Sequence, residues 1–182
     1  MPRQYQGPIC LVLFDVDGVL TDGSLHLNGQ GEQVKVFNVR DGLAIGLLRA
    51  HGIRSGVLSG KSSAPLDFRI AQLKFDVSVT GRLEKLEAYG SIKQKFGLDD
   101  DQIAYVGDDV VDLPLIGLVG RFYAPADAHA LVLERANYVM HANGGHGVAR
   151  EVAEHILQED GMSLEQVYHP LINQWNRHDA IQ

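Results

Sequence analysis

The sequence of 182 residues has a single cysteine, Cys10, so the chain cannot form an internal disulfide. Long apolar runs are also missing: the longest strongly apolar stretch, residues 9–14, is far shorter than the roughly 20 residues needed to cross a bilayer. Residues 1–6 contain no apolar stretch of the signal-peptide kind. We therefore expect neither a transmembrane protein nor a signal peptide, and a cytoplasmic location fits best.

Positive charge is scarce. The sequence has 16 Lys and Arg residues against 23 Asp and Glu residues, a formal net charge of −7, and it has no run of basic residues. A chain with this balance is a poor binder of nucleic acid. At long range it also repels anionic small molecules. If the substrate is an anion, the site must supply its own positive charge or a metal ion.

The remaining composition, 45% hydrophobic and 21% charged, is ordinary for a globular protein. The length suits one domain over residues 1–182, with a core over about 9–158. Short β-branched runs alternate with longer amphipathic ones. The strand-like runs are 9–14, 54–58, 76–79, 103–106, 121–124 and 138–140, and the helix-like runs are 43–50, 65–74, 83–96, 112–117, 128–135 and 148–158. This alternation predicts an α/β fold with a doubly wound, Rossmann-like parallel sheet, in which ligands bind at the carboxyl ends of strands.

Residues 24–39 interrupt the alternation. Leu25, Leu27, Val34 and Val36 alternate with polar residues on either side of NGQG at 28–31, which predicts an inserted β-hairpin. Because exposed strand edges invite pairing, we expect the hairpin to form an oligomer contact; a solvated flap is the alternative. In the C-terminal tail, about 162–182, the sequence SLEQ at 163–166 has the form of a capping box and predicts a short helix. Beyond Pro170 the tail is polar.

The strongest chemical signal is DVDGVLT at 15–21, directly after the first predicted strand. Asp15 and Asp17 repel each other, and a hard divalent cation, most simply Mg²⁺, would compensate them. A carboxylate can also attack phosphorus to form an aspartyl-phosphate, while a second one protonates the leaving oxygen and then activates water. Gly18 lets the backbone turn sharply beside a ligand. The structural alternative is an ordinary turn rich in Asp and Gly.

Further candidates also follow predicted strands. In GDDVVD at 107–112, Asp108 could complete a metal shell, and Asp109 and Asp112 could bind metal-bound water or hold other groups in place; alternatively, acidic residues simply suit a helix N-terminus. In LSGKS at 58–62, the Ser59 hydroxyl, backbone N–H groups and a lysine can hold a phosphoryl oxygen. Lys85 lies early in the helix predicted over 83–96. Taken alone, LSGKS is a common turn and Lys85 an ordinary surface lysine.

In this order along the chain, the motifs resemble those of the haloacid dehalogenase-like superfamily over about residues 9–158. Within it, the chain is similar to the 3-deoxy-D-manno-octulosonate 8-phosphate (KDO 8-phosphate) phosphatases. The segments that carry this likeness are DVDGVLTDG (15–23), FNVRDG (37–42), YVGDDVVDLP (105–114), ADAH (126–129) and the GGxG turn at 144–147.

The resemblance implies a role for each matching residue. Asp15 would be the nucleophile and a metal ligand, and Asp17 the general acid/base and a ligand through its backbone carbonyl. Asp108 would be the third protein ligand, while Ser59 and Lys85 would hold the transferred phosphoryl group. Three further residues would surround these groups and hold them in place: Thr21, Asp109 and Asp112.

The resemblance also implies a Mg²⁺-dependent, capless phosphatase of lipopolysaccharide biosynthesis that forms a homotetramer. The hairpin would lie at the tetramer core, and a neighbouring subunit would help to exclude water from the site. For Asp41 the alternative is capping of the helix that follows, and for Arg69 a solvated mid-helix position. The implied substrate contacts are Asn38, Val39, Arg40, Asp41, Gly42, Lys61, Arg69 and Lys85.

Three positions depart from the family pattern. Lys61 stands where arginine is common, and lysine lacks the planar fork that grips a carboxylate. Gly46 stands where many members have an arginine on the first long helix, and His146 replaces the arginine of a GGRG turn. KDO 8-phosphate presents both a phosphate and a carboxylate, so these changes bear on the substrate. A phosphatase of a nine-carbon sugar acid 9-phosphate is therefore an alternative.

Other interpretations stay open at this point. A phosphatase of another small phosphomonoester would show broad turnover of unrelated sugar phosphates. A phospho-receiver domain also combines acidic residues, a hydroxyl and a lysine, but it does not use a pair such as Asp15 and Asp17. An idle oligomeric scaffold would leave its clustered carboxylates without a compensating charge.

Overall fold

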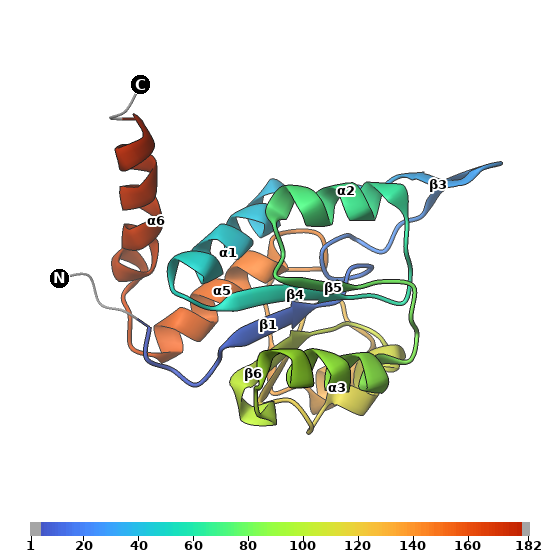
Figure 1. Ribbon diagram of the computed structural model, residues 1–182. Coiled ribbons are helices and arrows are strands. Elements are labelled where there is room, and N and C mark those ends of the chain that lie inside the picture. Colours follow the sequence, from blue (N-terminus) through green and yellow to red (C-terminus); the bar gives the residue numbers. More distant parts are fainter. Residues whose placement is uncertain (1–4, 180–182) are drawn as a thin grey trace.

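The computed structural model describes residues 5–179 and places six parallel strands in one sheet (Figure 1). In spatial order they are β5 (Val77–Val79), β4 (Arg54–Leu58), β1 (Leu11–Phe14), β6 (Ile103–Val106), β7 (Arg121–Ala124) and β8 (Tyr138–Val139). Every neighbouring pair is parallel. The doubly wound α/β fold is confirmed, and each strand begins and ends within two residues of its predicted range.

Helices cover both faces of the sheet, and each face has its own apolar core. Val12 and Phe14 of β1 lie in one core, together with side chains of α1, α2, α5 and α6, whereas Leu11 and Leu13 lie in the other core, with side chains of α3 and α4. A strand buried on both faces needs apolar residues at every position, which explains the unbroken apolar sequence of β1. The helices are α1 (Val39–Ala50), α2 (Ala64–Leu73), α3 (Lys85–Phe96), α4 (Ala130–Arg135), α5 (Val148–Glu159) and α6 (Leu164–Asp179), with the 3-10 turns η1 (Asp100–Gln102) and η2 (Val110–Leu115).

Later strands are added to the sheet on both sides of β1. The chain first adds β4 and β5 on one side, and then returns to add β6, β7 and β8 on the other. In such sheets the loops after the central strands separate at this reversal and leave a crevice at the carboxyl edge. Asp15 directly follows β1, Ser59 directly follows β4, and Asp108 follows β6 by two residues. The topology therefore brings residues from three distant segments to one edge.

The predicted hairpin is present between β1 and α1. Strands β2 (His26–Asn28) and β3 (Gly31–Val34) pair antiparallel, with a register shift near His26, and project away from the sheet (Figure 1). Its apolar side chains are largely exposed: Leu27 by 65%, Val34 by 55% and Val36 by 59%. The hairpin thus has no apolar layer beneath it within residues 5–179.

Two short helices differ from their predicted form. The segment predicted as a helix over 112–117 is the 3-10 turn η2, which contains Pro114, a residue that cannot donate a backbone hydrogen bond. Helix α4 begins at Ala130 rather than at residue 128, because the His129 ring nitrogen accepts a hydrogen bond from the backbone N–H of Leu131 and makes His129 the cap.

The C-terminal helix α6 is longer than predicted and continues through Pro170. The capping box is confirmed: the backbone N–H of Gln166 donates to Ser163 Oγ at 3.3 Å, and the backbone N–H of Ser163 donates to Gln166 Oε1 at 2.9 Å. Val167 and Leu171 are buried against α1 and α5, and this packing stabilises the helix across the proline. Within residues 5–179, none of the helices is long and apolar enough to cross a membrane.

Candidate active site

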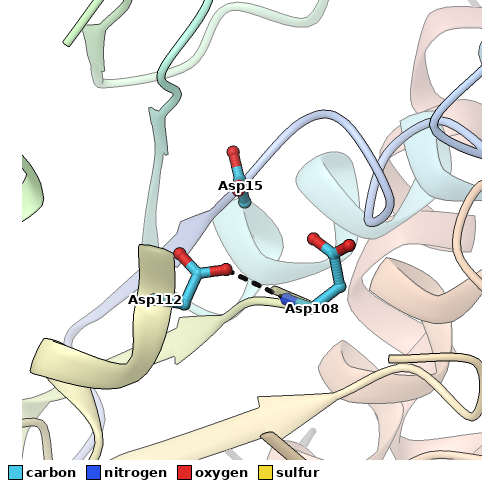
Figure 2. A group of neighbouring side chains, drawn as sticks. All are labelled: Asp15, Asp108 and Asp112. Carbon is cyan, nitrogen blue, oxygen red and sulfur yellow. Dashed lines mark hydrogen bonds between the residues drawn. The ribbon is translucent and has the colours of Figure 1, made fainter. Parts of the chain in front are cut away.

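Three carboxylates meet at the carboxyl edge of β1 and β6. Asp15 follows β1, Asp108 follows β6, and Asp112 lies in η2. Figure 2 shows the three side chains around one space, and one oxygen from each lies within 4.8 Å of the others. Asp15 and Asp112 are buried, and Asp108 is partly buried. Carboxylates this close repel one another, so the cluster requires positive charge.

Lys85, the first residue of α3, supplies part of that charge. Its side chain is fully buried, and Nζ donates hydrogen bonds to Asp15 Oδ2 at 2.6 Å and to Asp112 Oδ1 at 2.5 Å. Burial lowers the pKa of Lys85, but the charges of Asp15 and Asp112 outweigh burial and raise it. The ammonium group therefore stays charged beside Asp15.

One ammonium group does not neutralise three carboxylates. Burial, followed by the charges of Asp15 and Asp112, raises the pKa of Asp108 to about 8. Burial also raises the pKa of Asp15 to about 6, although Lys85 opposes the shift. Among residues 5–179, Asp108 Oδ1 has no hydrogen-bond partner although it is buried. An unpaired buried oxygen in an acidic cluster is the environment that a hard divalent cation such as Mg²⁺ relieves, so the residues present fit this ion.

Asp112 and Asp109 shape the loop that carries Asp108. Asp112 Oδ2 accepts the backbone N–H groups of Asp108 at 3.0 Å and of Asp109 at 3.3 Å, while its Oδ1 accepts from Lys85 and Tyr105. Asp109 caps η2 by accepting the backbone N–H of Val110 at 2.7 Å. Asp112 thus accepts four hydrogen bonds, whereas Asp15 accepts two, from the backbone N–H of Val16 and from Lys85, and Asp108 Oδ1 accepts none. Asp15 and Asp108 are therefore the carboxylates best able to hold a cation.

The carboxylate of Asp17 is held by two neighbours. Thr21 Oγ1 donates to Asp17 Oδ1 at 3.4 Å, and the buried Lys35 forms an ion pair with the same oxygen. Lys35 directly follows strand β3 of the hairpin and also pairs with Glu32 at 3.1 Å. Sequence analysis missed Lys35, because a single lysine at the end of a hairpin carries no motif.

Gly18 brings the loop after β1 against Asp108. Its φ of +83° lies in the left-handed region, and a Cβ atom there would lie 2.0 Å from Asp108 Oδ2. Glycine is therefore required at this position for both backbone conformation and space.

Ser59 lies one strand away from Asp15, where β4 pairs with β1. It is buried, and its Oγ accepts the backbone N–H of Lys61 at 3.3 Å. The side chain of Lys61 is exposed at the start of the loop before α2. The serine hydroxyl and the lysine thus lie at the same edge of the sheet as the acidic cluster.

Comparison with known proteins assigns this chain to a family. The model of haloacid dehalogenase-like hydrolases matches residues 75–152. The 3-deoxy-D-manno-octulosonate 8-phosphate phosphatase KdsC of Haemophilus influenzae is 44% identical over 155 residues, which are 85% of this chain and 86% of the relative. The chain belongs to the haloacid dehalogenase-like hydrolases.

Two solved structures show the same fold. The cobalt-bound deoxy-D-mannose-octulosonate 8-phosphate phosphatase of Haemophilus influenzae superimposes with a TM-score of 0.82 at 44% identity, covering 85% of this chain and 90% of that one. The Moraxella catarrhalis enzyme, in complex with magnesium, phosphate and KDO, gives 0.80 at 34% identity, covering 83% and 87%. Both likenesses extend over most of this haloacid dehalogenase-like hydrolase.

The segment FNVRDG at 37–42 contacts α2 and the loop before α5 in this hydrolase. Asn38 caps α1 by accepting the backbone N–H of Arg40, and its side chain donates to the Gly145 carbonyl at 3.2 Å. Arg69 donates to the Asn38 carbonyl at 3.3 Å and approaches Gly42 so closely that a Cβ there would lie 2.8 Å from its guanidinium. Arg69 is therefore not the freely solvated mid-helix arginine that was the alternative.

Two members of this segment have other environments. Asp41 is buried and accepts the backbone N–H of Ala149 at 3.0 Å, so it holds the start of α5. The alternative, that Asp41 caps the following helix, is wrong: Asn38 caps α1, and the Asp41 carboxylate bonds to the backbone of α5, more than 100 residues later. Val39 is 82% exposed and offers only an apolar side chain.

Gly46 and His146, two of the three positions that depart from the family pattern, lie in different parts of the structure. Gly46 faces α6, where a Cβ would lie 3.7 Å from Leu171 Cδ1, in ordinary contact. His146 is exposed, donates from Nδ1 to the Gly144 carbonyl at 2.7 Å, and lines a pocket with Arg40 and Arg150. Of the two, His146 is the one that lies beside a residue of the FNVRDG segment.

Proposed function

We propose that the chain is a Mg²⁺-dependent phosphatase that hydrolyses KDO 8-phosphate to KDO and phosphate in lipopolysaccharide biosynthesis. The observation that carries this proposal is the buried cluster of Asp15, Lys85 and Asp108, with its unpaired Asp108 oxygen. The relatives at 38–44% identity are KDO 8-phosphate phosphatases, and the Moraxella catarrhalis relative binds magnesium, phosphate and KDO.

Asp15, Asp108 and the backbone carbonyl of Asp17 would hold the Mg²⁺, which when bound neutralises negative charge on the phosphoryl oxygens. Asp15 attacks phosphorus with one carboxylate oxygen, and the bond from phosphorus to the sugar oxygen breaks. Asp17 gives its proton to that oxygen as the sugar leaves. The product of this step is an aspartyl-phosphate on Asp15.

The second step releases phosphate. Asp17 takes a proton from a water molecule as the water oxygen attacks phosphorus, and the bond between phosphorus and Asp15 breaks. This restores the carboxylate of Asp15 for the next cycle. Lys85 and Ser59 hold phosphoryl oxygens in both steps, and Thr21 and Lys35 orient the Asp17 carboxylate. Asp109 and Asp112 act indirectly, by holding the loop of Asp108.

We propose that cationic and amide groups of the FNVRDG segment, of α2 and of the loop after β4 bind the sugar acid. Asn38, Arg40, Gly42 and Arg69 lie together through the contacts of the FNVRDG segment, and Lys61 follows Ser59. Val39 and Asp41 belong to the same proposed set, although Asp41 acts on it through the start of α5.

The first experiment is phosphate release by the purified protein with Mg²⁺ from a panel of sugar phosphates. We expect KDO 8-phosphate to be the preferred substrate, EDTA to stop release, and Asp15→Asn to remove turnover while the fold stays intact. Preference for a nine-carbon sugar acid 9-phosphate would assign specificity to Lys61 and His146. Equal turnover of unrelated sugar phosphates would contradict the proposed substrate class, and no release at all would contradict the phosphatase.

We further propose that residues 1–182 act as a single domain in a cytoplasmic homotetramer. The hairpin supports the assembly, since Leu27, Val34 and Val36 expose apolar surface that a neighbouring subunit would cover. The single cysteine supports the compartment. Light scattering of Leu27→Glu should show smaller species, whereas Leu131→Glu, an exposed leucine of α4, should keep the native mass. A tetramer in both variants would remove the hairpin from the interface.

A further inference from the structure

Tyr105 takes part in the hydrogen bonding of the acidic cluster, although sequence analysis gave it no role within the segment 105–114. It lies in β6, and its side chain is fully buried. Its hydroxyl accepts a hydrogen bond from Lys85 Nζ at 2.9 Å and donates one to Asp112 Oδ1 at 2.7 Å. The ring is fixed by Phe122, with centroids 5.5 Å apart. The hydroxyl therefore has a set position between the ammonium group and the carboxylate.

All three N–H groups of Lys85 are engaged. An ammonium group has three donors, and here they meet Asp15 Oδ2, Asp112 Oδ1 and the Tyr105 hydroxyl. None remains for a phosphoryl oxygen, so Lys85 can bind one only by giving up a present partner. Leaving Asp15 or Asp112 would unpair a buried carboxylate, which is costly. Leaving Tyr105 separates the ammonium group from a neutral hydroxyl that still donates to Asp112.

We propose that Tyr105 is a positioning residue for Lys85. Between turnovers its hydroxyl holds the ammonium group in place beside Asp15, and on substrate binding it releases one N–H to the phosphoryl oxygen. This inference rests on the proposed phosphatase function, in which Lys85 touches the transferred group. Because the ring fills the core with or without its hydroxyl, Tyr105→Phe removes the two hydrogen bonds without opening a cavity.

The chain contains a matched control for this arrangement. Tyr89 is also a buried tyrosine of the same apolar core, and its hydroxyl donates to Asp100 Oδ1 at 2.6 Å. Lys93 donates to the same oxygen at 2.9 Å. This second group of tyrosine, lysine and aspartate lies between α3 and η1, apart from the acidic cluster. Tyr89→Phe thus removes a comparable hydroxyl–carboxylate bond without touching Lys85.

The kinetic test compares Tyr105→Phe with Tyr89→Phe under saturating Mg²⁺. We expect Tyr105→Phe to lower kcat by about tenfold with KM changed by less than about threefold, because the hydroxyl still donates to Asp112 after it releases Lys85 and so keeps the Asp112 partner of the ammonium group in place while charge develops on the phosphoryl group. Tyr89→Phe should keep the wild-type kcat. A purely structural Tyr105 would instead lower the melting temperatures of both variants to a similar extent and leave both kcat values unchanged, which would overturn the proposal.

A second measurement does not depend on activity. The ammonium group of Lys85, assigned by loss of its signal in Lys85→Arg, should give a protected ¹H–¹⁵N signal in the wild type and in Tyr89→Phe. In Tyr105→Phe we expect that signal to broaden as its protons exchange faster. An equally protected signal in Tyr105→Phe would overturn the proposal even in a chain that hydrolyses nothing. If the wild type released no phosphate but the signal depended on Tyr105, the proposed function would fail and the positioning of Lys85 would stand.

Discussion

Gly18→Ala gives the sharpest test of the acidic cluster, because it places one methyl group directly on a proposed metal ligand. An alanine Cβ at this position would lie 2.0 Å from Asp108 Oδ2 and 2.4 Å from its Cγ. Ordinary contact begins at 3.4 Å, so the Asp108 carboxylate would have to move by about 1.4 Å. Ligand distances at metal sites hold to about 0.2 Å, and such a shift removes Asp108 from the ion.

The backbone adds a separate cost. A residue with a side chain at φ +83° is strained by roughly 1–2 kcal/mol. Gly23→Ala carries the same cost at φ +77°, but its Cβ meets nothing closer than 3.7 Å. The difference between the two variants therefore isolates the displacement of Asp108 from the strain of the left-handed backbone.

The assay is Mg²⁺ binding by calorimetry, supported by phosphate release. Both variants should lose a similar amount of thermal stability without the ion. Gly18→Ala should bind Mg²⁺ at least about tenfold to a hundredfold more weakly than Gly23→Ala and lose activity to match. Equal Mg²⁺ affinity in the two variants would refute the placement of Asp108 at the metal.

Other predictions follow from charges near the site. Burial holds the pKa of Asp108 at about 8, so this carboxyl group must lose a proton before Mg²⁺ binds. The apparent Kd for Mg²⁺ should therefore fall about tenfold from pH 6 to pH 7 and level off above pH 8. A flat pH profile in calorimetry would contradict this. Lys35→Met should lower kcat by about tenfold by freeing the Asp17 carboxylate, whereas Lys93→Met should not; equal kcat values would remove Lys35 from the site. Burial raises the pKa of Asp41 in the folded state to about 6, so ionisation of this group disfavours folding. The difference in free energy of unfolding between wild type and Asp41→Ala, measured in urea, should therefore shrink by about 2 kcal/mol between pH 4 and pH 7. A difference that stays constant with pH would reject the shift.

The fold was largely predictable because its signals are local. The central strands β1 and β6 are buried at every position and have the apolar sequences LVLF and IAYV. The continuation of α6 beyond Pro170 was not predictable in this way. It depends on Val167 and Leu171 packing against α1 and α5, and such a contact becomes visible only when distant segments are brought together.

The residues of the candidate site likewise fall into those that could be predicted from the sequence and those that could not. Asp15, Asp17 and Asp108 follow strands with a recognisable spacing, so sequence was sufficient to single them out. Tyr105 and Lys35 were missed because their importance comes from one long-range partner each. Tyr105 appears in the sequence as one more apolar strand position, and Lys35 as a polar residue of a hairpin.

The distance along the chain between the partners in the site sets the order in which the site can form during synthesis. Lys85, which compensates Asp15, lies 70 residues later, and at about 5–20 residues per second it is made roughly 4–14 s after Asp15. Gly144 is made later still. It packs against the loop after β1 so closely that a Cβ atom at this position would lie 2.0 Å from the Gly18 carbonyl oxygen. Until Lys85 is made, the nascent chain carries Asp15 without the lysine that compensates it in the folded protein. The contacts of the site are therefore complete only after Gly144 has been made, and a chain that ends before Asp108 lacks one of the proposed metal ligands.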